Sequence, residues 1–258
     1  MPASLFSELP WQVLAAVPLI VLAGYTVFGA TGFGSSIIIV PALAHWFPLT
    51  AIVPLITALD CASTVNASLR QWRRAQWVEI RHIVPPMLLG IAAGALLLFK
   101  LPRAPALLAL GLFVAAYGAY LLLGRREWRA AHPAWAWPAG LLGGVFSVLF
   151  GTGGPLYMIY LSARIHDKTA LRATSSVIVT MSVLVRTVLF VATGLLLHAP
   201  LLVAAALLLP VMLAGYALGN RLHFALSRMG VMRAIATVLV GNGAWLIARA
   251  VTLLREDT

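Results

Sequence analysis

Gly29-Ala-Thr-Gly32-Phe-Gly34 and Gly151-Thr-Gly153-Gly154-Pro155 are two glycine-rich breaks that interrupt long apolar stretches of this chain about 120 residues apart. Each break opens an apolar segment that is too short to cross a bilayer comfortably, since a spanning helix needs roughly 20 apolar residues. Short, broken segments at matching places in two halves of a chain point to the binding site of a transporter. The two breaks therefore predict where the functional site of this protein lies.

The composition is that of a membrane protein. Apolar residues make up 62% of the 258 positions and charged residues only 10%, whereas a typical soluble domain has roughly 25% charged residues. The chain has many apolar segments near spanning length and no polar stretch long enough for a separate soluble domain. We therefore expect an all-α polytopic membrane protein that lies in a lipid bilayer.

The formal net charge of +11 does not indicate nucleic-acid binding. Aromatic residues are not interleaved with the basic ones, and most arginines lie in short loops between apolar segments, as the positive-inside rule predicts. The single cysteine, Cys61, excludes a disulfide within the chain and a cysteine-based metal cluster. We expect no cofactor, no bound metal and no nucleic-acid partner.

Hydrophobic runs between charged, proline or glycine residues predict ten helical elements. The first half has 11–28, 33–47, 50–69, 80–99 and 104–123, and the second has 136–150, 154–164, 168–193, 200–222 and 231–253. In each half the first two elements meet at the break, either as two thin crossings or as a re-entrant pair of half-helices, and three spanning helices follow. The predicted organisation is a first membrane repeat at 1–124, a cytoplasmic linker at 125–134 and a second membrane repeat at 135–258, within one integral transmembrane domain.

The basic loops orient these elements. Four arginine-rich loops are expected on the cytoplasmic side, whereas the loop around His198 and the loop near Lys100 and Arg103 carry few basic residues and are expected outside. The first half then begins outside and ends inside, and the second half does the reverse. This opposite orientation predicts two inverted repeats.

A second repeated motif supports duplication. Pro85-Pro-Met-Leu-Leu-Gly90-x3-Gly94 recurs as Pro210-Val-Met-Leu-Ala-Gly215-x3-Gly219. Small residues four positions apart let two helices approach closely, so both copies are expected at helix–helix contacts.

The breaks also predict an anion site. Unwound backbone leaves amide and carbonyl groups unpaired in hydrocarbon, so it persists only inside protein or against water or a ligand. The half-helix after each break presents free N–H groups and a positive dipole end, both of which favour an anion. Glycine-rich kinks that only permit tight packing are the alternative. The predicted substrate-binding residues are Thr31, Gly32, Phe33, Gly34, Ser35 and Ser36 in the first half and Gly151, Thr152, Gly153, Gly154 and Pro155 in the second.

Two charged residues, Asp60 and Arg186, lie inside apolar segments. An intramembrane charge normally faces the bundle interior and has a partner. Asp60 is either a coupling residue that takes up a proton or a hydrogen-bonded packing group. Arg186 is a candidate substrate-binding residue because its planar guanidinium matches oxyanions. Snorkelling of Arg186 to the outer interface and a structural ion pair with Asp60 are the alternatives.

The first break followed by Pro41, its second copy at 151–155 and the two Pro…Gly-x3-Gly segments resemble the sulfite exporter TauE/SafE family of bacterial permeases over nearly the whole chain. The resemblance implies a multi-pass protein of the bacterial inner membrane that transports small anions, often sulfite, sulfoacetate or other organosulfur compounds. Phe33 departs from a plain Gly-Gly-Gly form of the break, and it either narrows the pocket or packs.

We therefore expect a secondary transporter, not an enzyme, that moves a small anion such as sulfite or a sulfonate by alternating access at the two breaks. A proton or another ion is its expected coupling partner, and the sequence leaves the oligomeric state open. The alternatives are a non-transporting membrane anchor or assembly protein and a cation or metal permease.

Overall fold

The computed structural model describes residues 11–31, 34–123, 132–222 and 228–256, which are all-helical apart from their turns and contain no strand. The first half contains α1 (Trp11–Thr31), α2 (Ser35–Leu43), α3 (Leu49–Gln71), α4 (Trp77–Lys100) and α5 (Arg103–Leu122). The second half contains α6 (Ala136–Phe150), α7 (Gly154–Arg164), α8 (Lys168–Ala192), α9 (Ala199–Leu222) and α10 (Arg228–Glu256). These helices confirm the ten predicted elements and the all-α class.

Six described helical segments, in α4, α5, α6, α8, α9 and α10, are long and apolar enough to cross a bilayer. Shorter apolar stretches lie in α1 (Ala15–Ala30) and α3 (Leu49–Thr64). Large apolar side chains cover the outer surface, and Leu96 of α4 and Leu207 of α9 are 68% and 70% exposed. Such a surface suits hydrocarbon rather than water, as expected of a multi-pass membrane protein.

α2 and α7 are the two short helices, with 9 and 11 residues. At 1.5 Å per residue neither reaches across a hydrocarbon core about 30 Å thick. The prediction extended the second element to residue 47, but α2 ends at Leu43 and the chain turns through Ala44 to Pro48. The proline disfavours helical backbone at the residue before it, which explains the earlier end.

Each described break contains one glycine in the left-handed region. Gly34 has φ 96° and directly precedes α2, and Gly151 has φ 69° and directly follows α6. A side chain with a Cβ costs energy in this region, so glycine is the residue that lets the chain leave one half-helix and begin the next. The predicted breaks in the helices are confirmed at these positions.

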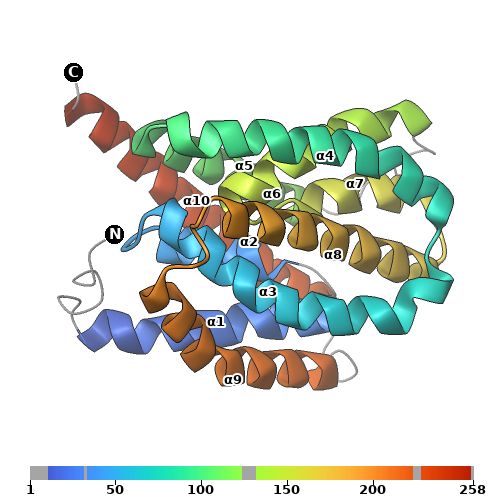
Figure 1. Cartoon of the computed structure of the whole chain (residues 1–258), viewed down its shortest axis with the longest axis horizontal. Coiled ribbons are helices and arrows are strands. Elements are labelled where there is room, and N and C mark those ends of the chain that lie inside the picture. The colour runs from blue at the N-terminus through green and yellow to red at the C-terminus, as the bar shows by residue number, and fades with distance from the viewer. Residues whose placement is uncertain (1–10, 32–33, 124–131, 223–227, 257–258) are drawn as a thin grey trace.

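Four helix pairs make the main contacts of the fold: α1 with α9, α4 with α6, α5 with α10, and α3 with α8. Figure 1 shows α1 and α9 along one edge of the molecule, α4 along the opposite edge, and α3 and α8 between them. If the five helices of the first half are matched in order with those of the second, α1 corresponds to α6 and α4 corresponds to α9. The α1–α9 pair then corresponds to the α6–α4 pair, while the α5–α10 and α3–α8 pairs each correspond to themselves. Helices of both halves are therefore interleaved.

The repeated glycine motifs lie at two of these contacts. A Cβ on Gly90 of α4 would collide with the α6 backbone at Leu141, and one on Gly219 of α9 would collide with the α1 backbone at Thr26. A Cβ on Gly94 would lie in tight contact, at 3.0 Å, with the α6 backbone at Val145. Glycine is required there because the two helix backbones come too close for any side chain. The prediction that both motifs lie at helix–helix contacts is confirmed.

The predicted linker at 125–134 falls largely on residues that lie outside the described ranges. The division of the chain into membrane repeats at 1–124 and 135–258 and the inverted orientation of these repeats stay predictions.

Candidate functional site

A small buried cavity lies where the two breaks meet. The volume open to the centres of water-sized molecules is about 30 Å³, which is room for a few waters or one small anion. The cavity is lined by residues from α1, α2, α3, α6, α7, α8 and both breaks: Phe28, Gly34, Ser35, Ser36, Ile37, Asp60, Thr64, Ser147, Gly151, Thr152, Gly153, Gly154, Pro155, Tyr157, Val179, Ser182, Val183 and Arg186.

Asp60 of α3 lies on the first-half side of the cavity and is 4% exposed. Its Oδ1 accepts hydrogen bonds from the hydroxyls of Tyr25 at 2.8 Å and Ser35 at 3.0 Å. Its Oδ2 accepts one from the hydroxyl of Ser36 at 3.1 Å. Because Ser35 and Ser36 are the first two residues of α2, the break positions both of these donors.

Arg186 of α8 is 1% exposed and pairs with Asp60, with Nη2 donating to Oδ2 at 3.3 Å. Its Nη1 donates to the backbone oxygen of Ser147 at 2.6 Å, and the Ser147 hydroxyl lies 2.8 Å from the Ser182 hydroxyl. The direct ion pair is therefore confirmed. The snorkelling alternative is wrong, because the guanidinium points into the protein and not toward an interface.

Three polar atoms at the cavity have no hydrogen-bond partner among the described residues. They are the hydroxyl oxygens of Thr152 and Tyr157 and Nε of Arg186, and all three residues are almost fully buried. Leaving a buried polar group unsatisfied costs about 1–3 kcal/mol. A ligand or water in the cavity would remove this cost.

Both short helices begin at the cavity without a side-chain cap, after Gly34 and Gly153. The first N–H groups of a helix have no partner within the helix, and the dipole makes this end positive. In α7, Pro155 occupies the first turn, where the missing N–H removes no helical hydrogen bond. The two helix starts thus add a positive field to the cavity.

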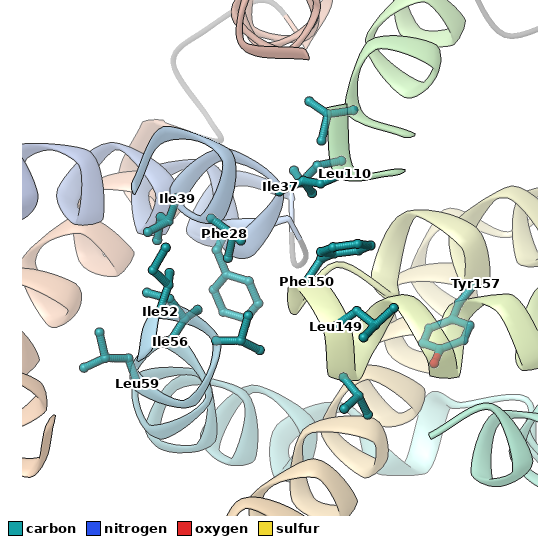
Figure 2. Close-up of a cluster of buried hydrophobic side chains, with 14 of the residues drawn as sticks. Phe28, Ile37, Ile39, Ile52, Ile56, Leu59, Leu110, Leu149, Phe150 and Tyr157 are labelled. Carbon is teal, nitrogen blue, oxygen red and sulfur yellow. The ribbon is translucent and has the colours of Figure 1, made fainter. Parts of the chain in front are cut away.

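Apolar side chains enclose this polar centre. Phe28, at 3% exposure, and Phe150, at 0%, stand at the ends of α1 and α6 just before the breaks. Figure 2 shows Phe28 beside Ile52 and Ile56 of α3, and Phe150 near Leu149 on the other side. Apolar surroundings of this kind lower the local dielectric and strengthen the charge interactions beside them.

The structure brings most of the predicted site residues together. The cavity is lined by Gly34, Ser35, Ser36, Gly151, Thr152, Gly153, Gly154, Pro155, Asp60 and Arg186. Thr31 is the last residue of α1 and its side chain is not described, while Gly32 and Phe33 lie outside the described residues. The role of each of these residues in binding stays a prediction.

Five polar residues of the site were not predicted from the sequence: Tyr25, Thr64, Ser147, Tyr157 and Ser182. Ser147 precedes Gly151 by four positions, and Ser182 precedes Arg186 by four. Residues four apart share one face of a helix, so this spacing was a signal that could have found both serines. Tyr25 had no comparable signal, because its link to Asp60 joins two separate helices.

A second ion pair fixes the far end of α7. Glu79, near the start of α4, accepts hydrogen bonds from the Tyr160 hydroxyl at 2.6 Å and from Nε and Nη2 of Arg164 at 3.0 and 2.9 Å. Glu79 is 5% exposed. The half-helix α7 is therefore held at one end by the break and at the other by α4.

Comparison with known proteins gives a consistent result. The model of the family described as Sulfite exporter TauE/SafE matches residues 16–246, a range that includes both breaks, Asp60 and Arg186. A curated relative from Comamonas testosteroni, called probable inner membrane transporter protein TsaS, is 28% identical over 190 residues, which cover 73% of this chain and 80% of the relative. No solved structure matches the chain.

Proposed function

Because the chain belongs to the sulfite exporter TauE/SafE family, we propose that it is a secondary transporter that moves a small oxyanion through the cavity between its two breaks. The chain is a membrane transporter of this family and not an enzyme. Its proposed location is the bacterial inner membrane, where the name of the TsaS relative puts that protein. Sulfite, sulfonates or other organosulfur oxyanions are the proposed substrates.

One observation carries the site assignment: the two breaks, a buried arginine and unpartnered polar atoms surround the same cavity. Arg186 Nε and the Thr152 hydroxyl have no partner among the described residues, and both can donate a hydrogen bond to an oxyanion. The starts of α2 and α7 add their positive dipole ends. A tetrahedral or trigonal anion of a few heavy atoms suits a cavity in which about 30 Å³ is open to the centres of water-sized molecules.

The chemistry of the lining favours an anion over a cation. Its polar side chains are hydroxyls, one carboxylate and one guanidinium, and the carboxylate oxygens of Asp60 already accept four hydrogen bonds. Within the described ranges, no three His, Cys, Asp or Glu side chains come together as a metal ion would require. These observations support an anion permease over the cation or metal permease.

The arrangement of the helices supports alternating access by two inverted repeats. The cross-pairs α1–α9 and α4–α6 correspond to each other when the halves are exchanged, as do the short helices α2 and α7 that meet at the cavity. Two related halves around one central site can open alternately to the two sides of the membrane.

Anion flux into vesicles containing the purified protein tests this proposal. Wild type is expected to exchange radiolabelled sulfite or methanesulfonate, and Arg186→Gln to lower the flux at least about tenfold, which corresponds to losing about 1.4 kcal/mol of binding. Arg81→Gln, at an exposed position outside the cavity, is the matched control and should transport normally. Normal flux in folded Arg186→Gln would refute the site, and no flux of any tested anion in wild type would favour the anchor or assembly protein.

A further inference from the structure

Four donors converge on the carboxylate of Asp60. They are the hydroxyls of Tyr25, Ser35 and Ser36 and the guanidinium of Arg186, at 2.8 to 3.3 Å. Hydroxyls at the start of a half-helix together with an arginine are the donors that a bound oxyanion would use. In this structure a side chain of the protein itself receives them.

The charge of the cavity limits what else can bind there. Among the described residues that line the cavity, Arg186 is the one cationic side chain and Asp60 is the one anionic side chain. The charges of this pair balance within an apolar enclosure. A substrate anion would add a second negative charge close to Asp60, where the low dielectric makes the repulsion strong.

We propose that the Asp60 carboxylate occupies the anion position of the site when substrate is absent. When a monoanion binds, Asp60 takes up one proton, and the negative charge of the anion replaces that of the carboxylate. The proton joins Asp60 from water, and Arg186 then balances the charge of the substrate. This inference rests on the proposed function. It explains how one buried pair both preserves the empty site and couples anion binding to protons.

The described polar side chains that face Asp60 are hydroxyls, phenols and the Arg186 guanidinium. Tyr25 of α1 donates directly to it, and Tyr157 of α7 lines the same cavity; a phenol ordinarily loses its proton near pH 10. α2 and α6 contribute serines there, and Tyr216 of α9 contacts the Phe28 ring instead. Among the described lining residues, Asp60 is therefore the carboxylic acid to which we assign the proton.

Chemical rescue provides the first test. Asp60→Ala leaves Arg186 without its counter-charge and leaves space where the carboxylate was. In a gluconate buffer, formate at ten times its Kd should raise the melting temperature of purified Asp60→Ala by about 3–6 °C. At the same formate concentration, wild type and Glu79→Gln, which lacks a buried acid outside the cavity, should be stabilised much less, because Asp60 still occupies the anion position. The inference is overturned if formate acts like gluconate on Asp60→Ala or stabilises all three proteins equally.

Anion affinity as a function of pH provides the second test and also serves if Asp60→Ala does not fold. Methanesulfonate keeps one negative charge from pH 6 to 8, so any change in its Kd comes from the protein. Wild-type Kd should rise about tenfold per pH unit, as uptake of one proton requires. Asp60→Asn should bind more tightly and independently of pH. A wild-type Kd that does not change with pH, or an unchanged slope in Asp60→Asn, would contradict proton uptake at Asp60.

The two proposals fail in different ways. A wild-type protein that transports anions without the pH slope would reject the role of Asp60 and leave the transport function standing. Formate rescue of Asp60→Ala in a protein that moves no anion across vesicles would reject transport and leave the carboxylate in the anion position.

Discussion

Replacing Gly151 with alanine tests the cavity with the smallest possible change. A Cβ at this position would lie 3.2 Å from the Ser36 Cβ and Oγ and 3.4 Å from Nη1 of Arg186. These separations are shorter than the 3.5–4.0 Å of favourable contact between non-bonded carbon atoms. Overpacking of this kind costs about 1–3 kcal/mol, so anion binding should weaken about 5- to 150-fold.

The same substitution also strains the backbone, and a matched control separates the two effects. Gly151 has φ 69° and Gly194 has φ 75°, so alanine costs about 1–2 kcal/mol at either position. A Cβ on Gly194 would meet nothing within 4 Å. Gly194→Ala therefore carries the backbone strain without contacting the cavity.

Both variants should be compared with wild type by thermal unfolding in detergent and by tracer binding of methanesulfonate. Both are expected to lose stability, but only Gly151→Ala should lose anion affinity and flux. Equal anion affinity in folded Gly151→Ala and Gly194→Ala would refute the proposal that an anion binds beside Gly151.

Three further predictions concern the helical framework, and each is read out by thermal unfolding. Gly219→Ala should destabilise the protein by about 1–3 kcal/mol because its Cβ meets the α1 backbone. The control Gly241→Ala has open space around it and should be neutral or stabilising by up to about 1 kcal/mol. Equal effects of the two substitutions would contradict the close α1–α9 contact. Asp167→Ala should lower the stability by about 0.5–2 kcal/mol, because it removes the N-terminal cap of α8 that accepts from the Ala170 N–H at 2.6 Å. Asp167→Asn should restore most of this loss. Unchanged stability of Asp167→Ala would show that the cap is not needed. Glu79→Gln should lower stability and increase protease cleavage near α7, because it removes the charge that holds Arg164; wild-type cleavage would refute that role.

Much of the fold could be predicted because its causes are local. Helix number follows from apolar length, and the end of α6 follows from Gly151, which has no Cβ to clash in the left-handed region. One helix boundary was predicted wrongly although its cause is also local. The element predicted to reach residue 47 ends at Leu43, because the chain turns before Pro48.

The candidate site could be predicted only in part. The hydroxyl and glycine residues of each break were identifiable because they cluster in sequence. Tyr25 was missed because a tyrosine in an apolar segment usually packs against lipid or neighbouring helices, and its hydrogen bond to Asp60 spans 35 residues. The alternatives for Arg186 could not be separated either, since snorkelling and ion pairing depend on which way its helix faces.

The sequence by itself determined that this chain lies in a bilayer, that it forms helices and that two of its apolar segments are broken. These are properties of composition and of backbone freedom at single residues. Only the tertiary structure decided that Asp60 and Arg186, 126 residues apart, neutralise each other between the two breaks. The physical reason is that a buried charge is stable only beside its counter-charge, and the packing of α3 against α8 brings that partner within reach.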